Sequence, residues 1–185
     1  MSYIKKILVV IAVLGLVFCG IKVYGITQTF SGPNTVFNNE EAYIYIPSKK
    51  DEHILKDELF PLLKDEESFK QVASRLGYNQ LKAGKYTIKK EMSNLDIVRT
   101  LQAKSDVINV VIPNTNEIDV IAKQISNQIE ATEMELITVL DDTLFLIDKK
   151  LKFPALYKPG AYKMPWNTSA TNFRDRMYKN ISKTN

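Results

Sequence analysis

The stretch LKAGKYTIKKEMSNLDIVRTL, residues 81–101, predicts a short strand followed by a helix. After a turn at residues 83–84, polar and apolar side chains alternate over residues 85–90, as in a strand with one buried face. Ser93 or Asn94 can then cap a helix, because a side-chain oxygen there accepts a hydrogen bond from a free N–H of the first turn. This helix is expected to bury three apolar residues at helical spacing: Leu95, Val98 and Leu101.

A short strand that stops at a proline occurs at two other places in the chain. AYIYIPSKKDEHILKDEL, residues 42–59, has the capping candidate Ser48 after its proline, and NVVIPNTNEIDVIAKQI, residues 109–125, has Asn114. Proline cannot donate a hydrogen bond to a sheet, so each strand ends there, and the next polar side chain can begin a helix. We therefore expect an α+β fold built from short strands and paired helices.

Further helices are predicted from apolar residues at helical spacing. Gly77 ends the first of them, Thr132 and Glu135 begin the third with capping-box spacing, and Phe173 and Met177 share one face of the last. The predicted ranges are 66–77, 116–128, 132–149 and 168–179.

The N-terminal stretch is apolar enough to cross a membrane. Residues 7–21 carry no charge, and the apolar character extends over residues 4–26 apart from Lys5, Lys6 and Lys22. About 20 apolar residues span a bilayer as a helix. No small-residue cleavage site follows the apolar run, and the bulky Phe18 before Cys19 disfavours a lipid-modified cysteine. We therefore expect an uncleaved single-pass anchor.

Charge gives the expected orientation and excludes one class of partner. Lys5 and Lys6 precede the span, which places the N-terminus in the cytoplasm and the main part of the chain outside. The chain has 25 Lys and Arg residues against 21 Asp and Glu residues, and three of the lysines flank the span. The exported part is thus close to neutral and offers no electrostatic footprint for nucleic acid.

Several kinds of site are disfavoured by the residues themselves. His53 is the single histidine, so a histidine-rich metal site is excluded. His53 lies on a predicted helix among charged residues, so we do not expect it in a Ser-His-Asp triad; we expect a solvated helix residue or, alternatively, a pH-sensitive contact. The single cysteine lies within the apolar span, and neither GxGxxG nor GxxxxGK occurs. We expect no metal ion and no organic cofactor.

The clustered carboxylates are expected to be structural. Glu130, Glu133 and Glu135 lie at the boundary between two predicted helices, where glutamates serve capping and the helix dipole. Asp141 and Asp142 are expected to form a pair on a helix face for the same reason.

An aromatic, turn-rich stretch, YKPGAYKMPWNTSATNFRDRM, occupies residues 157–177. In a loop stiffened by prolines, the rings of Tyr157, Tyr162 and Trp166 could lie against the apolar face of a sugar. The same three rings could instead anchor a long connection onto the core. The residues alone leave both interpretations open.

The whole chain resembles the endolytic murein transglycosylases of the MltG type (YceG-like), in the form typical of Bacteroidetes. The segments that carry the resemblance are residues 34–48, 62–73, 81–101 and 154–177, in one order. In the last segment, Pro159, Tyr162 and Trp166 keep the family's spacing, as does the run NTSA.

The resemblance implies a membrane-anchored lyase that cuts nascent peptidoglycan glycan strands without water and leaves 1,6-anhydro-muramyl ends. One glutamic acid would protonate the leaving oxygen and then help the muramyl 6-hydroxyl to close onto C1. The protein would lie in the bacterial plasma membrane, with its main part periplasmic, beside peptidoglycan synthases. The implied parts are a cytoplasmic tip and transmembrane helix over residues 1–26, a linker over 27–41, a LysM-like glycan-binding α+β module over 42–105, and the start of a mixed α/β catalytic domain over 106–185.

The chain departs from the family pattern in two ways. The family's catalytic glutamate follows the helix that FRDRMYKN begins, so we expect residues 1–185 to be an N-terminal portion without that segment and without activity of its own. Gly160 and Ala161 replace a usual Asn/Asp-Thr pair, and Lys163 replaces a common glutamate. No catalytic residue is therefore carried over, and the glycan-binding candidates are Tyr157, Tyr162 and Trp166. The alternative is a non-enzymatic, membrane-tethered peptidoglycan binder or synthase partner.

Overall fold

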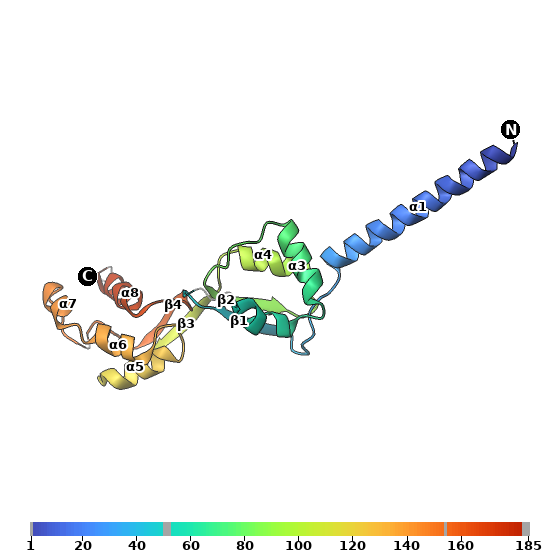
Figure 1. Ribbon diagram of the computed structural model, residues 1–185. Helices are drawn as coiled ribbons and strands as arrows, with labels where there is room; N and C mark the ends of the chain where they lie inside the picture. Colours follow the sequence, from blue (N-terminus) through green and yellow to red (C-terminus); the bar gives the residue numbers. More distant parts are fainter. Residues whose placement is uncertain (1, 50–52, 154, 183–185) are drawn as a thin grey trace. The chain divides into compact units, whose positions relative to one another are not determined.

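The computed structural model describes residues 2–49, 53–153 and 155–182, and its architecture is mixed α+β (Figure 1). The α+β class and the long apolar N-terminal helix expected from the sequence are confirmed. Over these residues, β1 pairs with β2 in one two-stranded sheet, and β3 pairs with β4 in another. The elements are α1 (Ser2–Ser31), β1 (Glu41–Ile46), α2 (Ile54–Glu58), the 3₁₀ helix η1 (Phe60–Leu62), α3 (Glu66–Arg75), β2 (Gly84–Lys89), α4 (Asn94–Gln102), β3 (Val107–Ile112), α5 (Ile118–Ser126), α6 (Glu133–Leu140), α7 (Thr143–Asp148), β4 (Gly160–Pro165) and α8 (Ala170–Ser182).

Contacts within the chain divide it into two compact units. Unit 1 consists of Met1–Ala42, Leu55–Gln80 and Thr87–Ala103. Unit 2 consists of Tyr43–Ile54, Leu81–Tyr86 and Lys104–Asn185. The strands β1 and β2 contribute residues to both units.

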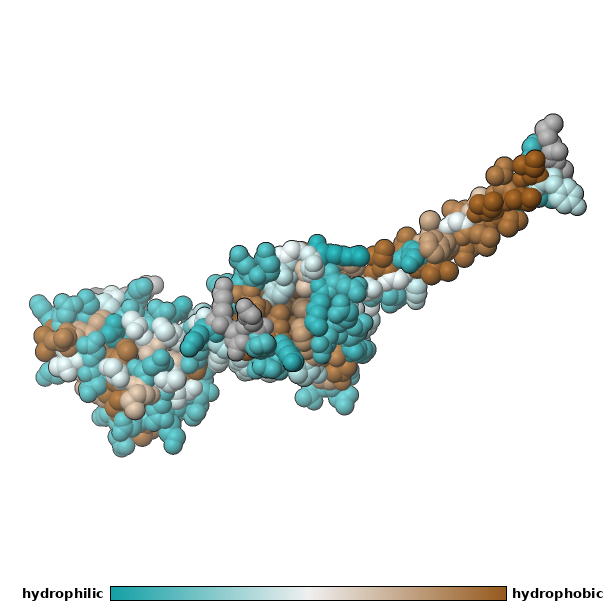
Figure 2. All heavy atoms as spheres, in the orientation of Figure 1, coloured by the Kyte–Doolittle hydropathy of each residue, from teal (hydrophilic) through white to brown (hydrophobic). Residues whose placement is uncertain are grey.

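Helix α1 is long and apolar enough to cross a bilayer. The segment Tyr3–Ser31 has 29 residues, about 44 Å at 1.5 Å per residue, against a hydrocarbon core of about 30 Å. Its apolar side chains are exposed along its length, as Figure 2 shows. Thr27 and Thr29 donate their hydroxyl hydrogens to the carbonyl oxygens four residues earlier, at 2.9 and 3.0 Å, and continue the helix beyond the predicted span.

The segment predicted as a linker is packed into unit 1 where it follows α1. Asn34 is 4% exposed, and its side-chain amide donates to the Asp65 carbonyl oxygen at 2.8 Å and to Oδ1 of Asn94 at 2.7 Å. Asn94 is 2% exposed and donates in turn to the carbonyl oxygen of Thr29 and to Oγ of Ser68, at 2.9 and 3.0 Å. A buried amide network therefore fixes the end of α1 to the starts of α3 and α4.

Helices α3 and α4 of unit 1 each bury one face, and the ends of α3 are fixed by capping bonds. Asp65 caps α3, accepting hydrogen bonds from the N–H groups of Glu67 and Ser68 at 3.0 and 3.1 Å. At the other end, Gly77 has φ +65°, and the N–H groups of Gly77 and Tyr78 donate to the carbonyls of residues 74 and 73. This pattern is a Schellman motif and confirms the predicted helix end.

Ser93, rather than Asn94, caps α4, and its Oγ accepts the N–H of Asp96 at 3.2 Å. Val98 and Leu101 are buried as predicted, but Leu95 is only half-buried. The third apolar residue of the buried face is Ile97, because the helix begins at residue 94 and turns residue 95 outward.

The stretch predicted as an aromatic loop contains a strand in unit 2. Residues 160–165 form β4, which pairs antiparallel with β3 from Ile112↔Gly160 to Val107↔Pro165. Phe173 and Met177 of α8 are 0% and 1% exposed, which confirms the predicted buried face. The two strands and helices α5, α6 and α8 enclose the core of unit 2, whose largest buried members are Tyr157, Phe173, Ile112, Ile121 and Ile125.

The helix predicted over residues 132–149 is two helices. The capping box of Thr132 and Glu135 begins α6 as predicted, at 3.3 and 2.9 Å, but the helix stops at Leu140. Asp142 caps α7 by accepting the N–H of Phe145 at 3.0 Å, and its other oxygen accepts a hydrogen bond from Arg174 at 2.9 Å. The prediction that Asp141 and Asp142 form a pair on a helix face was therefore wrong, because Asp142 supplies a new helix start.

Two other predicted caps do not cap helices. Asn114 precedes α5, whose cap position is Glu117, and the N–H of Glu117 donates to Oγ1 of Thr115 at 3.2 Å. Ser48 lies before the start of α2 at Ile54 and bonds to Glu130 instead. His53 is exposed and directly precedes α2.

Candidate functional site

The alternation of β1 and β2 places aromatic and basic side chains on one exposed face. Ile44 and Ile46 are 0% and 2% exposed, so Tyr43 and Tyr45 point to the opposite face of β1. Tyr43 is 48% exposed. On β2, Lys85 lies between two buried neighbours and therefore also points outward.

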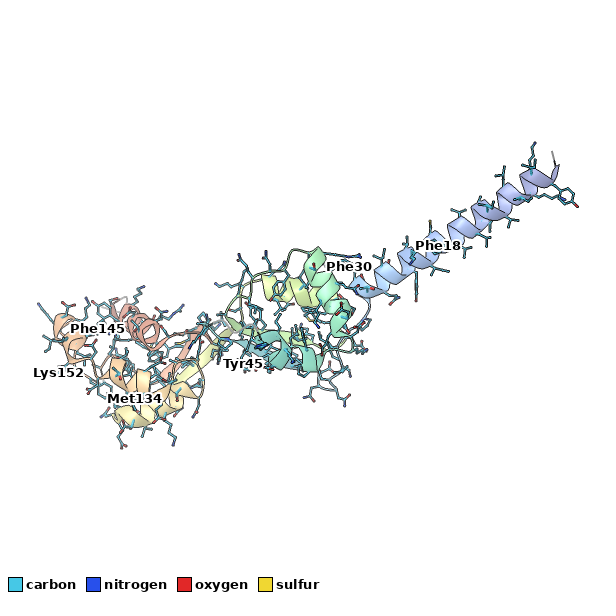
Figure 3. The ribbon with its side chains drawn as sticks, viewed as in Figure 1. Phe18, Phe30, Tyr45, Met134, Phe145 and Lys152 are labelled. Carbon is cyan, nitrogen blue, oxygen red and sulfur yellow. The ribbon has the colours of Figure 1, made fainter. Side chains whose placement is uncertain are left out.

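Four side chains of unit 2 meet in what we call the aromatic surface: Tyr43, Tyr45, Lys85 and Trp166. The Lys85 ammonium lies 3.7 Å from the ring centroid of Tyr43 and 5.9 Å from that of Tyr45. The ring of Tyr45, labelled in Figure 3, lies 5.0 Å from that of Trp166 with an interplanar angle of 60°. The surface thus combines aromatic faces with a cation that contacts them.

Glu130 holds the backbone on both sides of this surface. Its carboxylate accepts hydrogen bonds from the N–H of Ser48 at 2.6 Å and from the Ser48 hydroxyl at 2.5 Å. The N–H of Glu130 donates to the carbonyl oxygen of Trp166 at 2.8 Å. The residue after β4 and the segment after β1 are therefore both tied to Glu130, which favours the contact between Tyr45 and Trp166.

A glycine positions Lys85. Gly84 has φ +146°, and a Cβ built at this position would lie 2.2 Å from Cβ of Ser105. Any other residue would collide there, so glycine permits the close approach of the two segments. The carbonyl oxygen of Lys85 accepts the N–H of Asp106 at 2.8 Å, which fixes the start of β2.

The aromatic surface offers groups that are suited to binding a sugar with an acidic substituent. Aromatic faces that keep polar edges in water can stack on the apolar face of a sugar ring, and the lysine can bind an acidic substituent. Both oxygens of Glu130 are engaged by Ser48, so this carboxylate has a structural role. In the part of the chain that the structure describes, no three His, Cys, Asp or Glu side chains gather as a metal site.

The three aromatic residues singled out in the sequence lie in different environments. Tyr157 is 1% exposed and its ring stacks on Phe173, with centroids 6.2 Å apart, so it packs in the core. Burial raises the pKa of its hydroxyl. Tyr162 is half-buried on β4, and its hydroxyl donates to the carbonyl oxygen of Lys158 at 2.8 Å. Trp166 belongs to the aromatic surface.

Sequence reasoning missed three members of the aromatic surface, namely Tyr43, Tyr45 and Lys85. The alternation in the strand EAYIYI was the available signal, because it places two tyrosines on one face. The structural role expected for Glu135 is confirmed by its capping box, and hydrogen bonding to Thr132 lowers the pKa of its carboxyl.

The YceG-like family matches residues 44–185 of the chain. A crystal structure of a YceG-like protein from Listeria monocytogenes is 22% identical, with a TM-score of 0.38, over 80% of this chain. The match spans 57% of the Listeria chain. A comparison with curated proteins found no match.

Proposed function

Because the chain belongs to the YceG-like family, we propose that it is a membrane-anchored protein of peptidoglycan maturation, acting as an endolytic transglycosylase. Its reaction cleaves nascent glycan strands without water and leaves 1,6-anhydro-muramyl ends. The family match over residues 44–185 carries this proposal.

Within this function, residues 1–185 supply the anchor and a glycan-binding part. The chemistry needs a carboxylic acid that protonates the leaving oxygen and then accepts the proton of the muramyl 6-hydroxyl as this oxygen closes onto C1. We assign that acid to none of residues 1–185. The aromatic surface supports glycan binding, because Tyr45 and Trp166 present adjacent rings with Lys85 beside them.

The proposed division of labour follows the chain. Residues 42–105 form a LysM-like glycan-binding module, and residues 106–185 form the first part of the transglycosylase domain. Tyr162 borders the substrate from β4, and Trp166 contributes from the turn that follows.

The length and composition of α1 support anchoring in the bacterial plasma membrane. Lys5 and Lys6 before the span favour a cytoplasmic N-terminus and a periplasmic main part. A location beside the peptidoglycan synthases would give access to nascent strands.

A second candidate is a tethered glycan binder without enzymatic activity. The observation that favours it is the structural role of Glu130, which leaves an aromatic surface suited to binding without a free acid from this residue. Both candidates use the same surface, so they differ in the fate of the glycan and not in its binding.

Glycan-strand analysis of the bacterium that makes the protein separates the two candidates. Cells depleted of the protein should have longer glycan strands and fewer 1,6-anhydro-muramyl ends, measured by chromatography and mass spectrometry of digested cell wall. Unchanged strand lengths and ends would contradict the transglycosylase and favour the tethered binder. Purified residues 1–185 should bind strands without producing anhydro ends, and such products would place the acid among these residues.

A further inference from the structure

The outer edge of β3 is covered by a side chain. The N–H of Val111 donates to Oε1 of Gln128 at 2.8 Å, and Nε2 of Gln128 donates to the carbonyl oxygen of Val111 at 3.0 Å. Both polar groups of Val111 therefore point away from β4, so Val111↔Ala161 is a non-hydrogen-bonded pair. The amide of Gln128 takes the place of a neighbouring strand at this edge.

The same register identifies the groups on the outer edge of β4. Because pairs alternate, Asn109↔Lys163 and Val107↔Pro165 are also non-hydrogen-bonded, and Pro165 needs no N–H there. The N–H and C=O groups of Ala161 and Lys163 consequently point away from β3. Among the residues that the structure describes, these groups have no hydrogen-bond partner, so this edge remains open to another extended chain.

A basic pocket lies along this open edge. We call it the β4 pocket; it has a volume of about 490 Å³ and is lined by residues 161–164 together with Arg176, Lys179 and Asn180. Lys163, Arg176 and Lys179 all border it, and none of the three forms an ion pair within the described ranges. The pocket thus combines unpaired backbone groups with cations that lack a counter-ion.

We propose that the β4 pocket binds the carboxylate-bearing stem peptide of the peptidoglycan substrate, an inference that rests on the proposed function. One extended residue of the peptide exchanges backbone hydrogen bonds with Ala161 or Lys163, as in strand addition to a sheet edge. Its free carboxylates bind Arg176 and Lys179. The aromatic surface binds the sugars, and the β4 pocket reads the peptide that they carry.

The test measures binding of four probes to the full chain in detergent micelles by calorimetry and by backbone amide chemical shifts. The probes are a muramyl pentapeptide, the same compound with all its carboxylates amidated, chitotetraose, which has no peptide, and tetraglutamate, which has no sugar. The pentapeptide should bind and shift the amide signals of Ala161 and Lys163. Replacing both cations, Arg176→Gln with Lys179→Gln, should weaken it about tenfold, since each exposed ion pair contributes up to about fivefold and two contribute up to about 25-fold. The control Lys123→Gln, an exposed cation on α5, should change the affinity less than twofold.

The outcomes separate this inference from the proposed function. Pentapeptide binding that survives amidation or the double substitution would overturn the inference, as would binding that leaves the two amide signals unshifted. Equal affinity for tetraglutamate would overturn the assignment to the stem peptide and indicate an acidic protein segment instead. Chitotetraose binding without pentapeptide binding at this pocket would overturn the inference alone, and binding of neither probe would contradict the proposed function as well.

Discussion

Removal of the Glu130 carboxylate should loosen the aromatic surface and destabilise unit 2. In the intact protein this carboxylate accepts two hydrogen bonds from Ser48, at 2.6 and 2.5 Å, and the N–H of Glu130 is bonded to the carbonyl of Trp166. The substitution Glu130→Ala removes the two side-chain bonds and retains the backbone bond. The segment after β1 then loses its tie to residue 130, and Tyr45 is held less firmly against Trp166.

The expected magnitude follows from the exposure of these bonds. A hydrogen bond contributes about 0.5–1.5 kcal/mol net, and the charge of the acceptor adds little where water screens it. Two such bonds give about 1–3 kcal/mol for Glu130→Ala. Ser48→Ala removes the hydroxyl bond alone and should cost about 1 kcal/mol. Because the two substitutions remove one shared bond, the double variant should show a coupling of about 0.5–1 kcal/mol.

Urea unfolding of the four chains in this cycle measures the coupling. Trp166 is the single tryptophan of the chain, so its fluorescence reports directly on this part of unit 2. Glu130→Gln is the matched control: it keeps one acceptor oxygen for the N–H of Ser48 and should cost less than Glu130→Ala. A coupling below about 0.3 kcal/mol is the range of independent sites and would refute a stabilising role for the bond between the Ser48 hydroxyl and Glu130.

Three further stability changes are expected in urea unfolding. Asn94→Ala should lower the free energy of unfolding by about 2 kcal/mol, because it leaves the buried partners of the Asn94 amide unsatisfied. The control Asn79→Ala, at an exposed residue, should be near neutral. Equal costs would contradict a stabilising role for the buried amide network of Asn34 and Asn94. Gly77→Ala should cost about 1 kcal/mol because φ is +65° there, and Gly77→Asn should cost less since asparagine tolerates this conformation; the reverse order would contradict the backbone explanation. The pKa of Glu135 is lowered from 4.5, so its charge stabilises the fold above that pH and the contribution is lost as pH falls through the folded-state pKa. The advantage of the parent chain over Glu135→Gln should thus be present at pH 7 and disappear at low pH, and a pH-independent difference would exclude the charge as its cause.

Local sequence signals identified several helix ends correctly. Thr132 with Glu135, and Gly77 after α3, act through bonds that span a few residues, so their patterns are visible in the chain itself. The buried face of α8 followed from helical spacing for the same reason.

Strand β4 was missed because its composition indicates a turn. Gly160 and Pro165 lie at its two ends, and glycine and proline are usual signals for loops. Pro165 is tolerated because its pair with Val107 is non-hydrogen-bonded, and Gly160 has φ +150°. Both facts depend on the register with β3, which the stretch alone does not encode.

The aromatic surface depends on pairings between distant segments. Ser48 and Glu130 are 82 residues apart, and Asn34 and Asn94 are 60 residues apart, so no local pattern announces either bond. Trp166 and Tyr157 are both aromatic residues of one stretch, yet one lies in the aromatic surface and the other in the core. Composition could not separate them, because packing of the whole unit decides which ring is exposed.

The most direct test is titration of the full chain in detergent micelles with chitotetraose, followed by Trp166 fluorescence and by calorimetry. We predict saturable binding that changes the fluorescence of Trp166. The substitution Tyr45→Ala should weaken this binding by about fivefold or more. The control Leu144→Ala, which changes a side chain of α7 that is 80% exposed, should leave the binding intact. Binding of equal affinity in the Tyr45→Ala chain, or no binding by the parent chain, would contradict the assignment of glycan binding to the aromatic surface.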